Sequence, residues 1–185
     1  MKYLVLIITL FFAIALHGVA QGTYRGENGK VSFFSDALLE DIAAESNKVT
    51  SGLNMLTGEV AVLIPIKSFE FDKSLMREHF NENYLESDKY PDATFTGKMV
   101  KIPVLNRGEK MEFTVSGVLT IHGISCKRDI DIKFRADNDG SVVASGKFEI
   151  KVDDHKIKVP SLLFQNIAEV VEVTFELNLK KSLIP

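Results

Sequence analysis

The sequence predicts an all-β domain: an antiparallel barrel of about eight strands with one or two short helices. The last two-thirds of the chain alternates apolar and polar residues with a period of two, which is the pattern of strands that bury one face. Strands with one apolar face need a partner layer, and the helical segments are too few to supply it. Closure into a barrel, or a tightly packed sandwich, meets that need.

The clearest strands lie in the second half of the chain. An apolar residue or a glycine occupies every second position in residues 111–121, 130–136, 142–152 and 171–179. Asn138-Asp139-Gly140 separates the second and third of these segments and predicts a hairpin turn, because glycine accepts the positive φ that such turns need.

Four more strands are predicted in the first half. Residues 60–66 and 93–99 alternate clearly, whereas residues 30–35 and 48–56 do so more weakly. Together with the later segments they bring the total to about eight.

One segment predicts a helix, and a second one predicts a helical turn. Residues 72–84 form the helix, with Asp72 as its N-cap. Its buried side is expected to carry Leu75, Met76 and Phe80. A shorter helical turn is predicted in residues 36–45.

Residues 1–20 have the pattern of a secretory signal peptide. Lys2 gives a positive start, residues 3–16 are apolar, and Gly18-Val19-Ala20 places small residues at −3 and −1. An uncleaved membrane anchor is the alternative, although the apolar stretch is short for a bilayer. The mature protein is therefore expected to begin near Gln21, to form a single domain over residues 21–185, and to be periplasmic or secreted.

Charge and cysteine content exclude several classes of protein. The expected mature chain has 21 basic and 25 acidic residues and no long run of one sign, so neither nucleic acid nor an anionic membrane is predicted as a partner. A chain with one cysteine holds no internal disulfide. Its stability must come from burial and from backbone pairing.

The apolar faces define a candidate ligand site. An eight-stranded barrel is either filled by side chains or holds one small ligand. Gly97, Gly117 and Gly146 lie on these faces, where they either leave space or mark bends and bulges. A hollow interior would suit a long apolar chain, at about 0.8 kcal/mol per buried methylene. The predicted contacts in the strands are Phe95, Phe113, Val115, Gly117, Leu119, Phe134, Phe148 and Phe175.

The link between the last two strands is also apolar. Residues 157–168 contain Leu162, Leu163, Phe164 and Ile167. They either cap the end of the barrel as core or form its entrance. In the second case Leu163 and Phe164 contact the ligand.

His122 and Cys126 lie close together in the sequence, but they do not predict a metal site. Such a site needs about three or four ligands, and no ligand-rich cluster supplements these two. We expect His122 to fix the turn between two strands by a hydrogen bond and Cys126 to be a small, partly buried side chain. No Gly-x-Ser-x-Gly motif is present. Neither catalytic residues nor a cofactor are predicted.

Three stretches resemble YceI-like domains. VSGVLTIHGISCKRDI, residues 115–130, resembles the family signature G-x-L-T-I-H-G-V-T-x-x-V. Residues 75–99 are similar to its helix and following strand, and SGLNMLTGEV, residues 51–60, to its G-x-F-x-x-F-x-G element. The likeness covers residues 24–181.

The resemblance implies a lipocalin-like barrel in the periplasm or outside the cell. It also implies an elongated ligand such as a polyisoprenoid, an isoprenoid quinone or a fatty-acid derivative. Members often carry a histidine after the first strand pair, whereas this chain reads FFSDALLEDI in residues 33–42, so the head group stays open. Tyr84, His79 and Arg128 are candidate contacts at the rim.

The sequence is compatible with three functions. The first is a lipid-binding module for transport or sequestration, without stable membrane insertion and with homodimerisation left open. The second is an outer-membrane barrel whose apolar faces point outward, but such barrels carry aromatic girdles, and this chain has no Trp and four Tyr. The third is an enzyme on a lipocalin-like scaffold, for which no nucleophile–base pair is visible.

Overall fold

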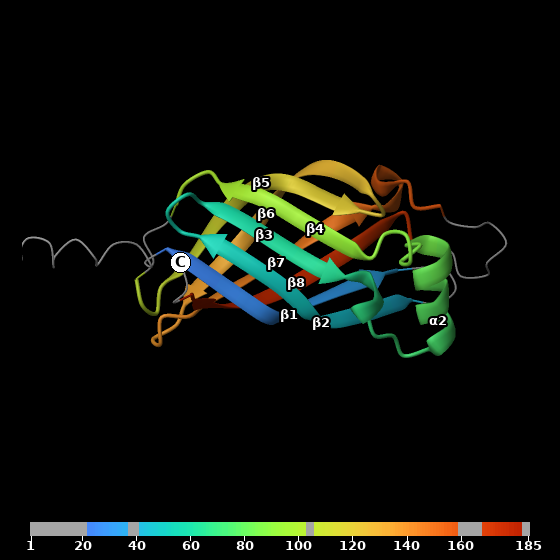
Figure 1. The fold of residues 1–185 in the computed structure, drawn as a ribbon, viewed down its shortest axis with the longest axis horizontal. Helices are drawn as coiled ribbons and strands as arrows, with labels where there is room; N and C mark the ends of the chain where they lie inside the picture. Colours follow the sequence, from blue (N-terminus) through green and yellow to red (C-terminus); the bar gives the residue numbers. More distant parts are fainter. Residues whose placement is uncertain (1–21, 37–40, 103–105, 159–167, 183–185) are drawn as a thin grey trace, which may run out of the picture.

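The described part of the chain folds into a closed antiparallel barrel (Figure 1). The computed structural model describes residues 22–36, 41–102, 106–158 and 168–182. Each strand pairs with the next one, and the last pairs with the first. The strands are β1 (Thr23–Ser35), β2 (Ile42–Asn54), β3 (Glu59–Pro65), β4 (Asp92–Met99), β5 (Lys110–Ile121), β6 (Ile124–Ala136), β7 (Val142–Lys151) and β8 (Val170–Lys181). The eight-stranded barrel is confirmed, and the sandwich alternative is wrong.

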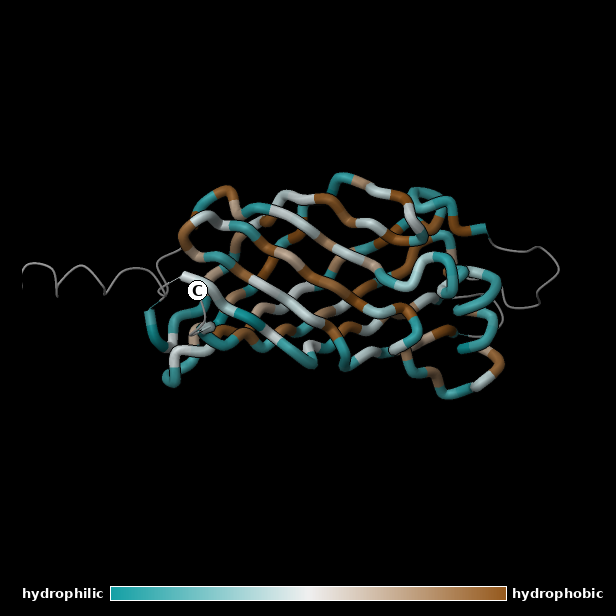
Figure 2. Tube along the Cα trace, in the orientation of Figure 1, coloured by the Kyte–Doolittle hydropathy of each residue, from teal (hydrophilic) through white to brown (hydrophobic). Residues whose placement is uncertain are grey.

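The apolar faces of the strands point into the barrel. In β6, Ile130, Ile132 and Phe134 are buried, while the charged residues between them, Asp131 and Lys133, are exposed. Figure 2 shows hydrophobic and hydrophilic residues alternating along several other strands. The strands therefore turn their apolar faces toward one another, not outward as the outer-membrane alternative requires. Within the described residues, no helix has both the length and the hydropathy to cross a membrane.

The predicted helical turn in residues 36–45 is wrong where the structure describes it. Ile42 begins β2, and Ile42 and Ala44 are buried while Ala43 is exposed, which is the period of a strand. This segment pairs with the end of β1, from Ser32 to Ser35. Ladder pairing here outweighs the helix propensity of Ala and Glu. Residues 37–40 lie outside the described residues.

β1 is the most irregular strand of the barrel. Its register with β2 shifts twice around Gly29, and its pairing with β8 is interrupted between Arg25 and Lys30. Such bulges increase local bending and leave backbone groups unpaired in the ladder. The wall of the barrel is therefore least regular along this stretch of β1.

A helical segment lies at the end of the barrel where β3 ends and β4 begins (Figure 1). It contains α2 (Ser74–His79), which continues into a π-helical turn over Phe80–Tyr84. A 3₁₀ turn over Ile66–Ser68 precedes it, and another over Val152–His155 follows β7. The predicted helix over residues 72–84 is thus present, but it is shorter and changes its pitch.

Two details of the predicted helix are wrong. The N-cap is Lys73, without a side-chain cap, and not Asp72. Leu75 is 55% exposed, whereas Met76 and Phe80 are buried as predicted. A six-residue helix followed by a wider turn presents only a narrow stripe to the barrel, and Leu75 falls outside that stripe.

Candidate functional site: an apolar lumen

The interior of the barrel contains two adjoining cavities. The first cavity, of about 80 Å³, is surrounded by the strands of the barrel. The second cavity, of about 110 Å³, lies next to the helical segment. Five side chains line both: Val31, Ile64, Leu119, Phe148 and Val173. Because they share this layer, the two cavities form one lumen that a ring of apolar side chains narrows in the middle.

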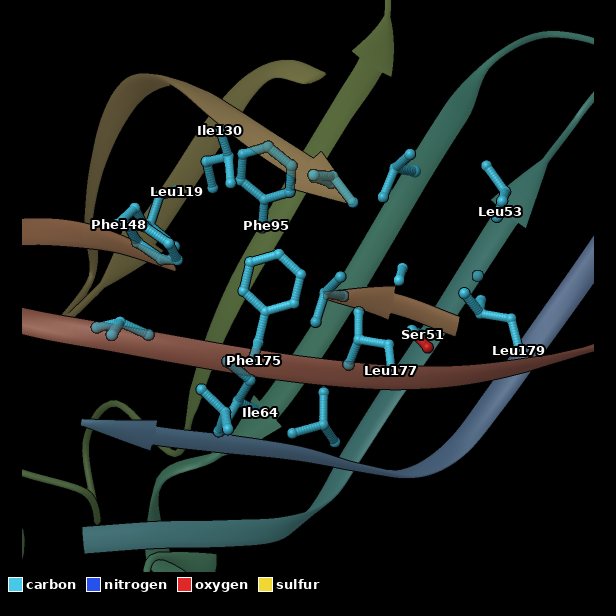
Figure 3. Close-up of a pocket in the computed structure, with 18 of the residues that line it drawn as sticks. Ser51, Leu53, Ile64, Phe95, Leu119, Ile130, Phe148, Phe175, Leu177 and Leu179 are labelled. Atoms are coloured by element: carbon cyan, nitrogen blue, oxygen red, sulfur yellow. The ribbon is translucent and has the colours of Figure 1, made fainter. Parts of the chain in front are cut away.

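Side chains from all parts of the barrel converge on the first cavity. Figure 3 shows Phe95 and Phe175 extending into it from β4 and β8. Although they face inward, Phe148, Phe175 and Val62 are only half-buried. Their remaining accessible surface belongs to the lumen, so the interior is incompletely packed.

The three inward glycines do not open the lumen further. A methyl group at Gly117 would lie 2.6 Å from Cζ of Phe95 and 2.5 Å from the carbonyl oxygen of Thr96. One at Gly146 would lie 2.6 Å from Cζ of Phe175. Phenylalanine rings thus fill the space above these glycines, a known arrangement in sheets. Of the two alternatives, the one in which these glycines leave open space is therefore wrong.

The alternative interpretation, that these glycines mark bulges, is also not supported between β4 and β5. The register runs without a shift from Thr94 to Met99, and Gly97 lies directly opposite Gly117. A methyl group at Gly97 would lie 3.0 Å from Cε1 of Phe95. Both glycines therefore allow the ring of Phe95 to lie flat on the backbone.

Aromatic rings close the second cavity toward the helical segment. Phe33, Phe69, Phe71 and Phe80 form one cluster with ring centroids 5.0–5.9 Å apart. Phe33 and Phe80 are stacked and the other pairs are tilted or edge-on, and such pairs stabilise the fold beyond the burial of the rings themselves. Ile157, from the link after β7, also lines this cavity. The helical segment therefore seals one end of the lumen through Phe80.

The structure brings five of the predicted contacts together at the first cavity: Phe95, Leu119, Phe134, Phe148 and Phe175. Three others do not line either cavity. Val115 is fully buried, Phe113 packs on Phe134 with centroids 4.4 Å apart, and Gly117 lies beneath Phe95. Leu163 and Phe164 fall outside the described residues, so their predicted role stays a prediction.

Several lining residues were missed because they come from β1 and β2. Val31, Val49, Ser51 and Leu53 line the first cavity, yet the bulges of β1 and the weak pattern of β2 hide their common face. The alternation of Val49, Ser51 and Leu53 was the available signal for the residues of β2.

The two cavities are small for a complete lipid. Each is below the roughly 150 Å³ of an engineered cavity that binds benzene, and drug-sized ligands occupy about 300–1,000 Å³. A longer chain fits only if the rings that narrow the lumen move. Phe148 is the largest side chain in the shared layer and lies directly between the two cavities.

His122 connects two segments at the helical end of the barrel. It lies in the β5–β6 turn with a φ of 52°, and its Nε2 donates a hydrogen bond of 2.6 Å to Glu86, which has a φ of 44°. The Tyr90 ring packs edge-on against His122, 4.6 Å between centroids, and covers Gly123. His122 thus fixes the turn by a hydrogen bond to the segment that follows the π-helical turn. We call this the Glu86–His122 contact.

Cys126 and His155 lie at the same corner of the barrel. The thiol of Cys126 donates to the carbonyl oxygen of Asp154 at 3.2 Å. His155 is fully buried, and its Nδ1 donates to the carbonyl oxygen of Ile124 at 3.0 Å. Burial lowers the pKa of His155 below its usual 6.5. The described residues contain no group of three or more His, Cys, Asp or Glu placed to hold a metal ion.

The three predicted rim contacts lie apart from the two cavities. Tyr84 is buried, and burial raises the pKa of its phenol. His79 and Tyr84 border a separate small cavity of about 20 Å³ beside Phe80. Arg128 forms an ion pair of 3.2 Å with Asp154 of the 3₁₀ turn that follows β7. None of the three lines the first or the second cavity.

The comparison with family models agrees with the resemblance read from the sequence. The model of the YceI-like domain matches residues 12–179. The match begins within the predicted signal peptide and ends in β8. No curated protein matches the chain.

Solved structures share the fold at low sequence identity. A polyisoprenoid-binding domain from Saccharophagus degradans, implicated in plant cell wall breakdown, is 18% identical with a TM-score of 0.76, covering 87% of this chain and 99% of its own. BcnA of Burkholderia cenocepacia is also 18% identical, with a TM-score of 0.65 and coverage of 81% and 95%. A YceI protein of Campylobacter jejuni is 23% identical, with a TM-score of 0.53 and coverage of 70% and 78%.

Proposed function

Because the chain belongs to the family of YceI-like domains, we propose that its barrel binds one chain-like lipid in the lumen, for transport or sequestration. The observation that carries the proposal is the lining of the two cavities, in which every side chain but one of the described residues is apolar. A polyisoprenoid, an isoprenoid quinone or a fatty-acid derivative has the required shape. The similar domain from Saccharophagus degradans binds polyisoprenoids, which supports the first of these.

The physical basis of binding would be transfer of hydrocarbon out of water. Each buried methylene contributes about 0.8 kcal/mol, so about ten of them supply on the order of 8 kcal/mol before the cost of ordering the chain. The described lining contains no charged side chain that would have to be desolvated. It also contains no acid, base or metal ligand, which favours binding without chemical conversion.

The proposal requires the lumen to open. We expect rotation of Phe148 to join the two cavities, since its ring lies in the layer that lines both. Residues 1–20 support export before the lipid is bound, which would place the protein in the periplasm or outside the cell.

A lumen-filling substitution tests the proposal. Val62 faces the first cavity, whereas its neighbour Ala61 is exposed on the outer surface of β3. Val62→Phe adds a ring inside the barrel, and Ala61→Phe adds one outside. The retention of phytanol, a saturated isoprenoid alcohol, would be measured by gel filtration, solvent extraction and gas chromatography.

We expect Val62→Phe to weaken retention about tenfold or more, equivalent to about 1.4 kcal/mol, and Ala61→Phe to retain phytanol like the parent protein. Overpacking costs about 1–3 kcal/mol of stability, so urea denaturation must first show that Val62→Phe is folded. Equal retention by the parent protein and a folded Val62→Phe variant would place the lipid outside the lumen. No retention by the parent protein would refute the proposed function.

A further inference from the structure

Ser51 places a hydroxyl group in an otherwise apolar lumen. Among the described residues that line the two cavities, it carries the only polar side chain. It is 5% exposed, and its Oγ has no hydrogen-bond partner within the part of the chain that the structure describes. Figure 3 shows Ser51 on the lumen wall near Leu179 and Leu177.

The hydroxyl is costly where it lies. An unpaired buried donor destabilises the folded protein, whereas alanine would keep nearly the same packing without an unpaired donor. A serine with a hydrogen-bond partner would need no further explanation. Ser46, on the same strand, is also buried, and its hydroxyl lies 2.6 Å from the hydroxyl of Ser68. Ser51 differs from Ser46 because its Oγ has no hydrogen-bond partner among the described residues.

The surroundings of Ser51 bring a second oxygen to the same place. Ser51 pairs with Gly26 of β1, at the start of the stretch where β1 and β8 are no longer paired. A methyl group at Gly26 would lie 2.5 Å from Oγ of Ser51 and 2.8 Å from the carbonyl oxygen of Asn178. Both oxygens therefore converge on the inner side of Gly26, where no side chain separates them.

We propose that Ser51 recognises a single uncharged oxygen on the lipid, so that the ligand is a long-chain alcohol or a quinone and not a plain hydrocarbon. This inference rests on the proposed function. Rotation about one side-chain torsion turns Oγ toward the first cavity. There the hydroxyl group can donate a hydrogen bond to a ligand oxygen or accept one from a ligand hydroxyl group. Because the described lining carries no charge, a phosphate or carboxylate would be buried without a partner there.

The position of Ser51 also fixes the direction of the lipid. Ser51 lies near the end of β2 that leads into the β2–β3 turn, whereas Phe80 of the π-helical turn lines the second cavity. Figure 1 shows the β2–β3 turn at the end of the barrel opposite the helical segment. The ligand oxygen therefore lies at the end with the β2–β3 turn. The hydrocarbon tail runs past Phe148 toward Phe80.

A competition experiment tests the inference. The full-length mature protein is incubated with equal amounts of phytanol and phytane, which share one branched carbon skeleton and differ by one hydroxyl group, both supplied from the same detergent micelles. After gel filtration, the bound lipids are extracted and their ratio is measured by gas chromatography. The same measurement is made for Ser51→Ala and for Thr50→Ala, which removes a hydroxyl from the exposed outer face.

We expect the ratio of phytanol to phytane to fall about fivefold in Ser51→Ala and to stay unchanged in Thr50→Ala. Since all three proteins draw on the same micelles, the change in ratio reports the hydroxyl contact alone. Bound lipid with the same ratio in the parent protein and in Ser51→Ala would overturn the role of Ser51 while leaving the proposed function intact. If none of the three proteins bound either lipid, the result would instead contradict the proposed function itself.

Discussion

Two phenylalanine rings occupy the places that inward glycines leave in the barrel wall. Phe95 covers Gly97 and Gly117, and Phe175 covers Gly146. The sequence places all five residues on apolar faces. It does not show whether the space beside such a glycine is empty or is filled by an aromatic ring. Side-chain rotamers decide this, and periodicity carries no information about rotamers.

A pair of glycine substitutions tests this arrangement at the level of single residues. Gly117→Ala would place a methyl group 2.5 Å from a backbone oxygen that cannot easily move, so we expect a loss of about 1–3 kcal/mol in the free energy of unfolding. Gly52→Ala would meet no atom within 4 Å and should stay within about 0.5 kcal/mol of the parent protein. Urea denaturation of both variants measures the difference, and equal stability would contradict the close packing around Gly117.

Among the elements, strands with strict alternation were predictable along most of their length, and the irregular strands β1 and β2 only in part. β5, β7 and β8 follow the predicted segments closely, because a strand with a period of two buries one face only. β6 begins at Ile124, six residues before the predicted segment. β2 begins within a segment that predicted a helical turn, since its Ala and Glu residues have helix propensity. Pairing with β1 decides its conformation, and that partner is not visible in the local sequence.

The helical segment is held to the barrel by the Glu86–His122 contact. Both residues have positive φ, a conformation that costs free energy in a residue other than glycine and that surrounding contacts must maintain. The hydrogen bond from His122 is the main reason why the pKa of Glu86 is below its usual 4.5. The contact therefore contributes stability above about pH 4.5 and loses it as the pH falls through the lowered pKa of Glu86.

We predict that Glu86→Ala loosens the helical segment without unfolding the barrel. Amide hydrogen exchange in residues 74–85 should become several-fold faster at neutral pH, while exchange in β5 and β6 stays the same. Asp88→Ala is the matched control, because Asp88 pairs with Lys67 on the exposed surface, where ion pairs contribute little. Equal exchange rates in residues 74–85 of both variants would show that the Glu86–His122 contact does not hold the segment.

For the molecule as a whole, closure of the barrel was predictable but its open volume was not. Strands with one apolar face must enclose that face, and the eight segments in the sequence are enough to close a barrel. The volume of the lumen depends on where Phe95, Phe148 and Phe175 lie, and thus on packing between strands that are distant in the chain. The narrow lumen follows from these rings, and its proposed ligand must displace some of them.

A crystal structure of the mature protein with phytanol tests the lumen most directly. The account predicts one lipid inside the barrel, with its hydroxyl group within hydrogen-bond distance of Ser51, its tail beneath Phe80, and the ring of Phe148 turned aside. A lipid bound to the outer surface would contradict it. So would a lumen that stays empty, with Phe148 in its present position, at phytanol concentrations where the protein retains the lipid.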